Sequence, residues 1–294
     1  MANAVAYPVD LHTHSIRSDG ALSPAELVRR AGERGVRVMA LADHDTLEGI
    51  AEATAAGERV GVRVVAASEL NTESAWGDVH VLGYFLDPLD AALADRLRWL
   101  RENRGRRIEL MVERLAALGY PVALERVMEI AQGGALGRPH LAQALVEAGH
   151  VPSYDAAFDT LLAKSSPAYV TRVGLTPLEA VQLVRASGGV PSLAHPGTVE
   201  IDLEVALPPL VAEGLAAIEC YYGSHTVEAT VRYLALAERF GVVPTGGSDF
   251  HGRGEHGAPL GGVPVPSSSV DALEARRERT GEAPSPIAAG PPTR

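Results

Sequence analysis

The chain has 294 residues, 46% of them hydrophobic and 21% charged, and a formal net charge of −11, a composition that excludes wholesale disorder. No apolar run reaches the ~20 residues of a membrane span, the start MANAVAYPVD lacks the features of a secretory signal, and the single cysteine, Cys220, excludes an intramolecular disulfide or a cysteine-based zinc cluster. We therefore expect a cytoplasmic protein with no membrane contact, whose acidic surface does not attract nucleic acid unless the charge is locally reversed.

The first part of the chain alternates short apolar runs with helical runs. Residues 9–14 are predicted to form a strand, and the capping box Ser23-Pro24-Ala25-Glu26 begins a helix that ends near Gly35. Further strands are predicted at 36–42, 62–67 and 78–85, with a helix at 46–59. Repeated strand–helix units predict an α/β fold with a mostly parallel sheet and helices outside, open or closed into a barrel.

The pattern changes after residue 87, because no strand is recognisable up to about residue 169. Helices are predicted there at 90–118, 122–132, 139–149 and 154–164. We interpret residues 88–169 as an inserted all-helical subdomain.

Strands and helices then alternate again, beginning with a second capping box at Thr176 and Glu179. The predicted strands are 190–194, 216–220 and 242–246, and the predicted helices are 176–188, 203–214 and 226–240. Residues 1–87 and 170–265 are thus predicted to form one discontinuous catalytic domain. Residues 266–294 are expected to be a largely disordered tail apart from one short helical run.

Residues able to bind metal recur at the predicted strand ends, where parallel α/β sheets place their active sites. Any one of them, taken alone, could be an ordinary polar residue, but nine at equivalent positions indicate a metal site. Imidazole mixed with carboxylate suits zinc, manganese or iron better than magnesium or calcium. The nine residues are His12, His14, Asp19, His44, Glu69, His80, His195, Asp249 and His251.

These motifs resemble the PHP (polymerase and histidinol phosphatase) family. The resemblance is carried by Asp10-Leu11-His12-Thr13-His14, Asp19-Gly20, Asp43-His44-Asp45, Glu69, His80, Ala194-His195-Pro196 and Ser248-Asp249-Phe250-His251. It implies a distorted seven-stranded (β/α) barrel with three divalent ions, usually manganese and sometimes iron or zinc. The helical insertion is similar to that of the subgroup that includes 3′,5′-nucleoside bisphosphate phosphatases.

The resemblance also implies how the nine residues divide among three ions. One ion would take His12, His14, Glu69 and Asp249, a second would share Glu69 and add His80 and His195, and a third would take Asp19, His44 and His251. Three divalent ions and three carboxylates leave a local charge of about +3, since ligand histidines are neutral. This is the reversal of sign that an anionic substrate requires.

The resulting hypothesis is a phosphatase that removes the 3′-phosphate of a nucleoside 3′,5′-bisphosphate through a metal-bridging hydroxide. A 5′-to-3′ exonuclease on short RNA and a histidinol-phosphate phosphatase are alternatives with the same metals. Histidinol phosphate fits the insertion less well because it is a smaller substrate. A non-hydrolytic metal-binding module is the alternative from another class, and the complete ligand set argues against it. No protein partner can be inferred.

Candidate substrate-binding residues lie in and after the insertion. Arg138 and His140 stand at a predicted helix start, where backbone N–H groups favour anions, and are expected to bind the remote phosphate. His225 could contact substrate or act as the leaving-group acid, and Lys164 and Arg172 are weaker candidates.

Other polar residues have ordinary interpretations. The six arginines between Arg96 and Arg107 are interpreted as a solvated helix face, with a nucleic-acid track as the alternative. Asp10, Asp43 and Asp45 could orient ligand imidazoles, or Asp45 could cap a helix.

Overall fold

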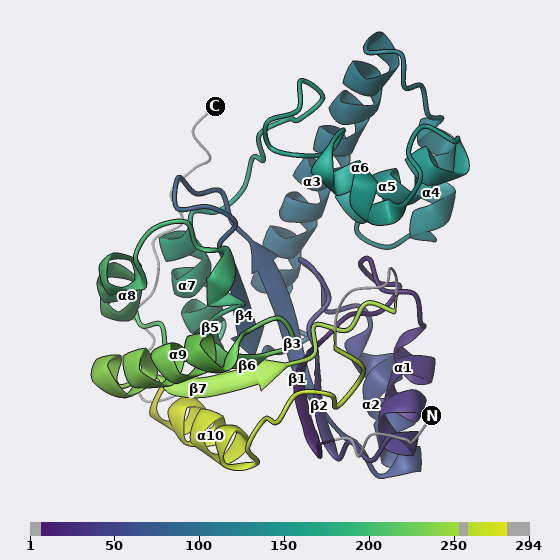
Figure 1. The fold of residues 1–294 in the computed structure, drawn as a ribbon. Coiled ribbons are helices and arrows are strands. Elements are labelled where there is room, and N and C mark those ends of the chain that lie inside the picture. The colour runs from purple at the N-terminus through teal and green to yellow at the C-terminus, as the bar shows by residue number, and fades with distance from the viewer. Residues whose placement is uncertain (1–6, 253–257, 281–294) are drawn as a thin grey trace.

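The computed structural model describes residues 7–252 and 258–280, and its centre is a seven-stranded sheet. Helices pack around the outside of the sheet, and a helical lobe rises from one end of it (Figure 1). The strands are β1 (Val9–Thr13), β2 (Val38–Leu41), β3 (Arg63–Asn71), β4 (His80–Tyr84), β5 (Val190–Leu193), β6 (Ala217–Tyr222) and β7 (Val243–Gly247).

The strands lie in the order in which they follow one another along the chain, and all neighbouring pairs are parallel except those of β4. β4 runs antiparallel to both β3 and β5. The reason is the short β3–β4 connection, since a parallel crossover needs a dozen or more residues. The prediction of a mostly parallel sheet is confirmed, with one reversed strand.

The sheet closes almost into a barrel where β7 returns to β1. A bridge between Thr13, the last residue of β1, and Phe250, which follows β7, joins the two edges of the sheet. Gly247 permits this approach, because a Cβ at that position would lie 2.4 Å from the backbone nitrogen of His12. The predicted distorted (β/α)7 barrel is confirmed.

The helices follow the predicted order, and local capping explains several of their starts. Ser23 accepts a hydrogen bond from Glu26 N at the start of the first helix, and Thr176 and Glu179 form a complete capping box. The helices are α1 (Pro24–Glu33), α2 (Ile50–Val60), α3 (Ala91–Ala117), α4 (Leu124–Ala131), α5 (Arg138–Glu147), α6 (Tyr154–Asp159), α7 (Pro177–Ala186), α8 (Leu203–Ala212), α9 (Val227–Phe240) and α10 (Ser268–Thr280), with a short 3₁₀ turn η1 (Pro196–Thr198).

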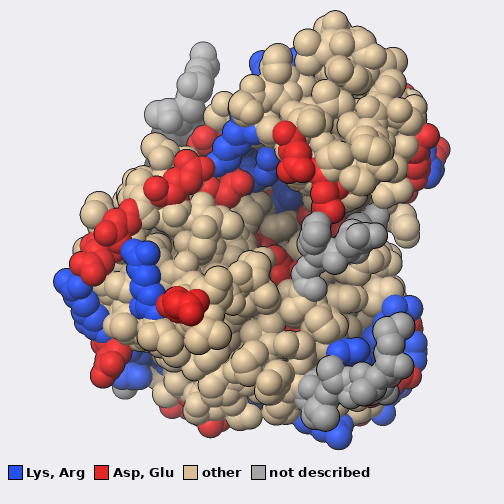
Figure 2. Space-filling view, in the orientation of Figure 1, with Lys and Arg blue, Asp and Glu red and all other residues tan. Residues whose placement is uncertain are grey.

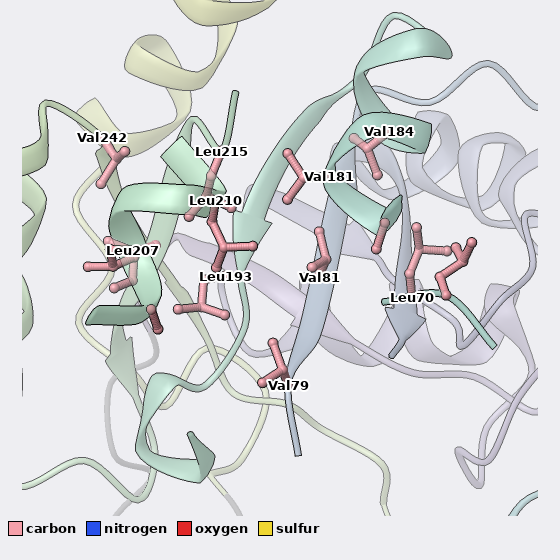
Figure 3. Close-up of a cluster of buried hydrophobic side chains, with 14 of the residues drawn as sticks. Leu70, Val79, Val81, Val181, Val184, Leu193, Leu207, Leu210, Leu215 and Val242 are labelled. Carbon is pink, nitrogen blue, oxygen red and sulfur yellow. The ribbon is translucent and has the colours of Figure 1, made fainter. Parts of the chain in front are cut away.

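A large apolar cluster joins the sheet to its outer helices. Side chains of β4 and β5, including Val81 and Leu193, meet those of α7 and α8, including Val184 and Leu207 (Figure 3). The cluster also contains Leu93, Leu97 and Leu100 from the first half of α3. The base of α3 is therefore anchored on the barrel.

The helical lobe has a core of its own, as expected for an inserted subdomain. Ile108, Met111 and Leu115 from the second half of α3 pack there with apolar residues of α4 and α5. The change of packing partner thus falls inside α3 and not at residue 88, the predicted boundary. One continuous helix joins the two cores, so the orientation of the lobe depends on that helix (Figure 1).

The tail predicted at residues 266–294 contains a helix at 268–280, which is the one short helical run that the sequence analysis expected. These residues form α10, whose Val270 and Leu273 are buried in the same cluster as Val9 of β1 and Val243 of β7. The rest of the predicted tail, 281–294, lies outside the described residues. None of the helices in the described part of the chain combines the length and apolarity of a membrane span.

Candidate metal centre

The nine predicted metal ligands converge at one edge of the barrel. His12 and His14 come from the end of β1, Glu69 from β3 and His195 from the residue pair that follows β5. His80 is the first residue of β4, and it reaches this edge because β4 runs in the opposite direction. Strand reversal therefore brings the beginning of one strand to the ends of the others.

Three groups of possible ligand atoms form at this edge, with the atoms of each group lying within 4.8 Å of one another. The grouping coincides with the three predicted ligand sets, except that His14 also adjoins the third. The groups are His12, His14, Glu69 and Asp249; Glu69, His80 and His195; and His14, Asp19, His44 and His251.

Glu69 lies at the centre of the arrangement. Its Oε1 is 2.7 Å from His80 Nδ1 and 2.9 Å from His195 Nε2. Its Oε2 is 3.1 Å from His12 Nε2 and 3.3 Å from His14 Nε2. One carboxyl group thus faces two ligand groups with different oxygens, which is the arrangement of a bridging carboxylate.

The chemistry of the site fits divalent ions. His14 and Asp249 are among the residues with buried nitrogen or oxygen atoms that lack a hydrogen-bond partner in the described structure. Burying such atoms costs free energy unless an ion or a water molecule supplies the missing interaction. Burial opposes ionisation of Glu69, Asp19 and Asp249, but the surrounding histidines outweigh it and hold the pKa of each carboxyl well below its usual value. The site therefore presents anionic oxygen and imidazole nitrogen together.

Glu219 of β6 is a functional residue that the sequence analysis missed. Its Oε1 lies 3.1 Å from His12 Nδ1, and its Oε2 accepts a hydrogen bond from the backbone N–H of His195 at 2.7 Å. A carboxylate only accepts, so His12 donates from Nδ1 to Glu219, and this contact orients the ring with Nε2 towards Glu69. The available signal was a glutamate within the apolar run of a buried strand.

The aspartates that flank the ligands mainly hold loops and do not contact imidazoles directly. Asp10 accepts hydrogen bonds from the backbone N–H and the hydroxyl of Ser248, next to Asp249. Asp43 likewise binds the hydroxyls of Ser15 and Ser18. Both aspartates fix the loops that present ligand residues.

Asp45 connects the centre to the helical insertion. Arg104 of α3 donates from Nη1 to Asp45 Oδ2 at 3.1 Å, and Asn71 Nδ2 donates to the same oxygen at 3.2 Å. Asn71 Nδ2 also lies 3.0 Å from His44 Nδ1. A continuous set of polar contacts therefore runs from α3 to the imidazole of His44.

Several residues at this edge have positive φ angles that side chains other than glycine rarely adopt. The values are +55° at Asp45, +23° at His195 and +52° at Asp249. Backbone conformations of this kind persist where surrounding contacts over-determine them. Here the hydrogen bonds that His195 N–H donates to Glu219 and that Ser248 donates to Asp10 hold the two ligand loops.

A second concentration of charge, the arginine cluster, consists of Arg107, Arg138 and Arg172. Arg107 is 5% exposed, and burial and the neighbouring Arg172 and Arg138 lower its pKa to about 10. Arg107 Nη2 and Arg172 Nε are buried and have no hydrogen-bond partner among the described residues. Three cations thus crowd together with donors that have no partner among the described residues, an arrangement that suits an anion.

Asp78 connects the arginine cluster to the metal edge. Its carboxyl group is 3.7 Å from Arg138 Nη2 and 3.5 Å from Lys164 Nζ, and it is two residues from His80. Burial opposes ionisation of Asp78, but His80 and Arg138 outweigh it and lower the pKa. Figure 2 shows a hollow between the helical lobe and the barrel, with Lys and Arg side chains along its upper wall.

Arg138 and His140 have different surroundings. Arg138 lies near the rings of Phe158 and Tyr169, 5.7 and 5.8 Å from their centres, and its side chain is partly exposed. His140 is buried, and its Nδ1 accepts a hydrogen bond from Gly137 N at 3.1 Å. His140 therefore closes the start of α5, the helix that presents Arg138.

The interpretation of the α3 arginines as a solvated face is wrong for two of them. Arg104 and Arg107 are buried, whereas Arg98 and Arg106 are exposed. A helix of this length places residues three apart on the same face. Arg104 and Arg107 lie on the face turned towards the barrel and the end of the insertion.

His225 lies beyond the metal edge, in the loop that follows β6. Its Nδ1 donates to the backbone oxygen of Cys220 at 3.1 Å, so Nε2 keeps its lone pair. Burial lowers the pKa of His225, which opposes its use as an acid at neutral pH. Cys220 itself is buried in the apolar core, and burial together with Glu219 raises the pKa of its thiol to about 12.

Comparison with known proteins gives one consistent family. A family profile described as PHP domain matches residues 10–177. A 3′,5′-nucleoside bisphosphate phosphatase of Chromobacterium violaceum is 34% identical over 86% of this chain and 90% of its own length. The 5′-3′ exoribonuclease Rnm of Escherichia coli is 34% identical over 84% of this chain and 86% of its own length.

A solved structure shares the complete architecture. It comes from Bifidobacterium adolescentis and is provisionally described as a metal-dependent phosphoesterase. The TM-score is 0.85 at 31% sequence identity, and the match covers 92% of this chain and 96% of the other. The barrel and its helical insertion are therefore found together in that protein as well.

Proposed function

The chain belongs to the PHP family and is a metal-dependent phosphoesterase, and from this premise we propose that it removes the 3′-phosphate from nucleoside 3′,5′-bisphosphates. The observation that carries the proposal is the presence of two separate positions for anions beside the same hollow. One is the metal edge, and the other is the arginine cluster. A substrate with two phosphates can occupy both.

The arginine cluster is the position for the remote 5′-phosphate. Arg107 and Arg172 have buried donors that find no partner within the described part of the chain, and Arg138 shares its acid, Asp78, with Lys164. Arg binds phosphate through two parallel hydrogen bonds, which fits a terminal phosphate group. His140 contributes by holding the start of α5 and thereby Arg138.

The nine metal-edge residues are the proposed ligands of three divalent ions, with manganese as the first candidate and iron or zinc as alternatives. When bound, such ions would lower the pKa of a water and neutralise charge on the phosphoryl oxygens. Glu69 would hold two of the ions through its two oxygens. Glu219 keeps the lone pair of His12 turned inward, and Asn71 and Asp45 hold the ring of His44.

A 5′-to-3′ exonuclease on short RNA is the second candidate, and the relationship to the E. coli exoribonuclease favours it. The chemistry differs little, because both reactions break the bond between phosphorus and the 3′-oxygen of a nucleotide that carries a 5′-phosphate. The difference is whether the 3′-phosphate is terminal or joined to a further nucleotide. Histidinol phosphate carries one phosphate and would leave the arginine cluster unused.

Chromatographic analysis of the products formed with added manganese tests the proposal, because it detects both inorganic phosphate and released nucleotides. The substrates are nucleoside 3′,5′-bisphosphates, nucleoside 5′- and 3′-monophosphates, histidinol phosphate and 5′-phosphorylated RNA of two to five nucleotides. We expect the highest kcat/KM for a bisphosphate, with a nucleoside 5′-monophosphate as the product. Faster release of nucleotides from RNA would favour the exonuclease, and the absence of turnover with every substrate would favour a non-hydrolytic module.

A further inference from the structure

A cavity of about 290 Å³ lies beside the metal edge, on the side of β6 and α9. Its lining includes His195, Tyr222, His225 and Tyr233, together with Gly197 and Ala229. Three of the rings follow one another, with 5.0 Å between the centres of Tyr222 and His225 and 4.7 Å between those of His225 and Tyr233. The cavity therefore has a continuous wall of aromatic rings.

Residues that line the cavity connect it to both proposed anion sites. His195, a proposed metal ligand, belongs to its lining. Thr198, also in the lining, donates a hydrogen bond to the backbone oxygen of Asp78 at 2.6 Å, and the Asp78 carboxyl group contacts Arg138. The short segment from His195 to Thr198 thus borders the cavity and also contacts the metal edge and Asp78.

The chemistry of the cavity differs from that of its two neighbours. None of its lining residues is a lysine, arginine, aspartate or glutamate. The polar groups are hydroxyls, such as that of Ser224, and the imidazoles of His195 and His225. The Nε2 atom of His225 has no hydrogen-bond partner in the described structure. Gly197 borders this nitrogen, since a Cβ there would lie 3.5 Å from it. Such a wall suits a neutral, planar group.

The size of the cavity suits one part of a nucleotide. Pockets that enclose drug-sized ligands are usually about 300–1,000 Å³, so this one lies at the lower limit. It is large enough for a heteroaromatic ring system. In a bisphosphate held at its two charged ends, the remaining uncharged part is the nucleoside.

We propose that this cavity binds the nucleobase of the substrate, which lies against Tyr222, His225 and Tyr233. The inference rests on the proposed function and adds a third contact to it. The base is the part of the substrate that distinguishes a nucleotide from other sugar bisphosphates. The cavity would therefore give the enzyme its preference for nucleosides.

Comparing a nucleoside 3′,5′-bisphosphate with its abasic analogue, 1-deoxyribose 3,5-bisphosphate, tests this proposal. Base stacking on aromatic side chains corresponds to about 5- to 150-fold in affinity. We expect the wild-type enzyme to prefer the nucleoside by a factor in that range. Equal kcat/KM for the two substrates would overturn the proposal and leave the phosphatase function intact.

Ala229→Leu fills the cavity from α9 without altering a metal-edge or arginine-cluster residue. It should lower kcat/KM for the nucleoside bisphosphate to nearly the value for the abasic analogue and leave the analogue's value unchanged. Ala235→Leu, at an exposed position of the same helix, is the matched control and should change neither. An equal loss with both substrates, or no loss with either, would contradict the assignment.

Two further measurements test the proposal if Ala229→Leu is unstable or if the wild-type protein hydrolyses no bisphosphate. Ser224→Phe narrows the cavity from an exposed position and should act as Ala229→Leu does if the latter is unstable. If the wild-type protein hydrolyses no bisphosphate, the proposed function fails, and binding of free adenosine and uridine tests the cavity alone. Binding that Ala229→Leu abolishes would support the cavity assignment, and no binding to the wild-type protein would overturn it.

Discussion

The barrel and the helical insertion bury charge in opposite ways. At the metal edge of the barrel, carboxyl groups and imidazoles surround one another, and the pKa of Glu69 is held far below its usual value. In and after the insertion, Arg107, Arg138 and Arg172 crowd together, and the pKa of Arg107 falls to about 10. The first arrangement requires cations, and the second requires an anion.

This difference suggests a way for an acidic protein to bind a highly anionic substrate. The formal net charge of −11 repels phosphate at long range. The local charge of the metal edge becomes positive only when ions are bound, whereas the arginine cluster is positive with or without bound ions. We therefore expect mutations in the two regions to have different effects. Mutations at the metal edge of the barrel should change metal content, and mutations in the insertion should change the preference for bisphosphates.

The largest effect is expected from Glu69→Gln, which keeps the side chain's shape and removes its charge. Loss of a carboxylate shared by two ions should cost roughly 1,000-fold or more in kcat, from several kcal/mol of metal stabilisation at ~1.4 kcal/mol per decade. Metal analysis after manganese loading should show the loss of two ions. His251→Ala is the comparison variant and should lose mainly one. Retention of a full metal complement by Glu69→Gln would contradict the bridging role.

The second-largest effect is expected from a substitution in the insertion alone. Arg138→Met keeps the apolar stem and removes the guanidinium, and a charge-assisted hydrogen bond of ~1.5–3 kcal/mol corresponds to roughly 10- to 150-fold in kcat/KM. The loss should fall on bisphosphates and spare a nitrophenyl phosphate, while metal content stays unchanged. Arg98→Met, at an exposed arginine of α3, serves as control. Equal losses with both substrates would show that Arg138 does not hold the remote phosphate.

A smaller effect would test whether the two regions are coupled. Arg104→Met removes the contact from α3 to Asp45, which leads through Asn71 to His44. Loss of such a supporting contact weakens metal affinity by about 10-fold at the lower end of the usual range. Manganese titration should show one of the three ions bound more weakly, and Arg106→Met should show no change. A drop in Tm with unaltered metal affinity would mean that Arg104 only anchors the insertion.

The smallest effect on activity is expected at Cys220, an ionisable barrel residue with no part in either charged region, whose thiol instead affects stability at high pH. Burial raises the pKa of its thiol from 9.0 to about 12. The folded state therefore retains a proton that the unfolded state releases above pH 9, so stability falls between pH 9 and 12 by at most about 1.4 kcal/mol per pH unit. Urea unfolding of Cys220→Ala should lose less stability over this range than the wild type. Identical pH profiles would show that the thiol titrates normally.

Much of the barrel could be predicted from the sequence because its signals are local. Ser23 and Thr176 mark helix starts through capping boxes, and an alternating pattern places His12 and His14 on one face of a strand. The nine candidate ligands could be named because strand ends in this architecture meet at one edge. Their number and type, not their positions in space, indicated a metal centre.

Only the tertiary structure decided which distant residues support that centre. Glu219 contacts His12 across 207 residues of sequence, and Arg104 reaches Asp45 across 59. The arginines of α3 looked alike because helix periodicity gives a face but not its neighbour, and Arg104 and Arg107 turned out to be buried. The sequence by itself determined the kinds of chemical groups and the elements that present them. The closure of the sheet into a barrel and the packing of the insertion decided which groups became partners. Contacts between distant segments leave no local pattern in the sequence.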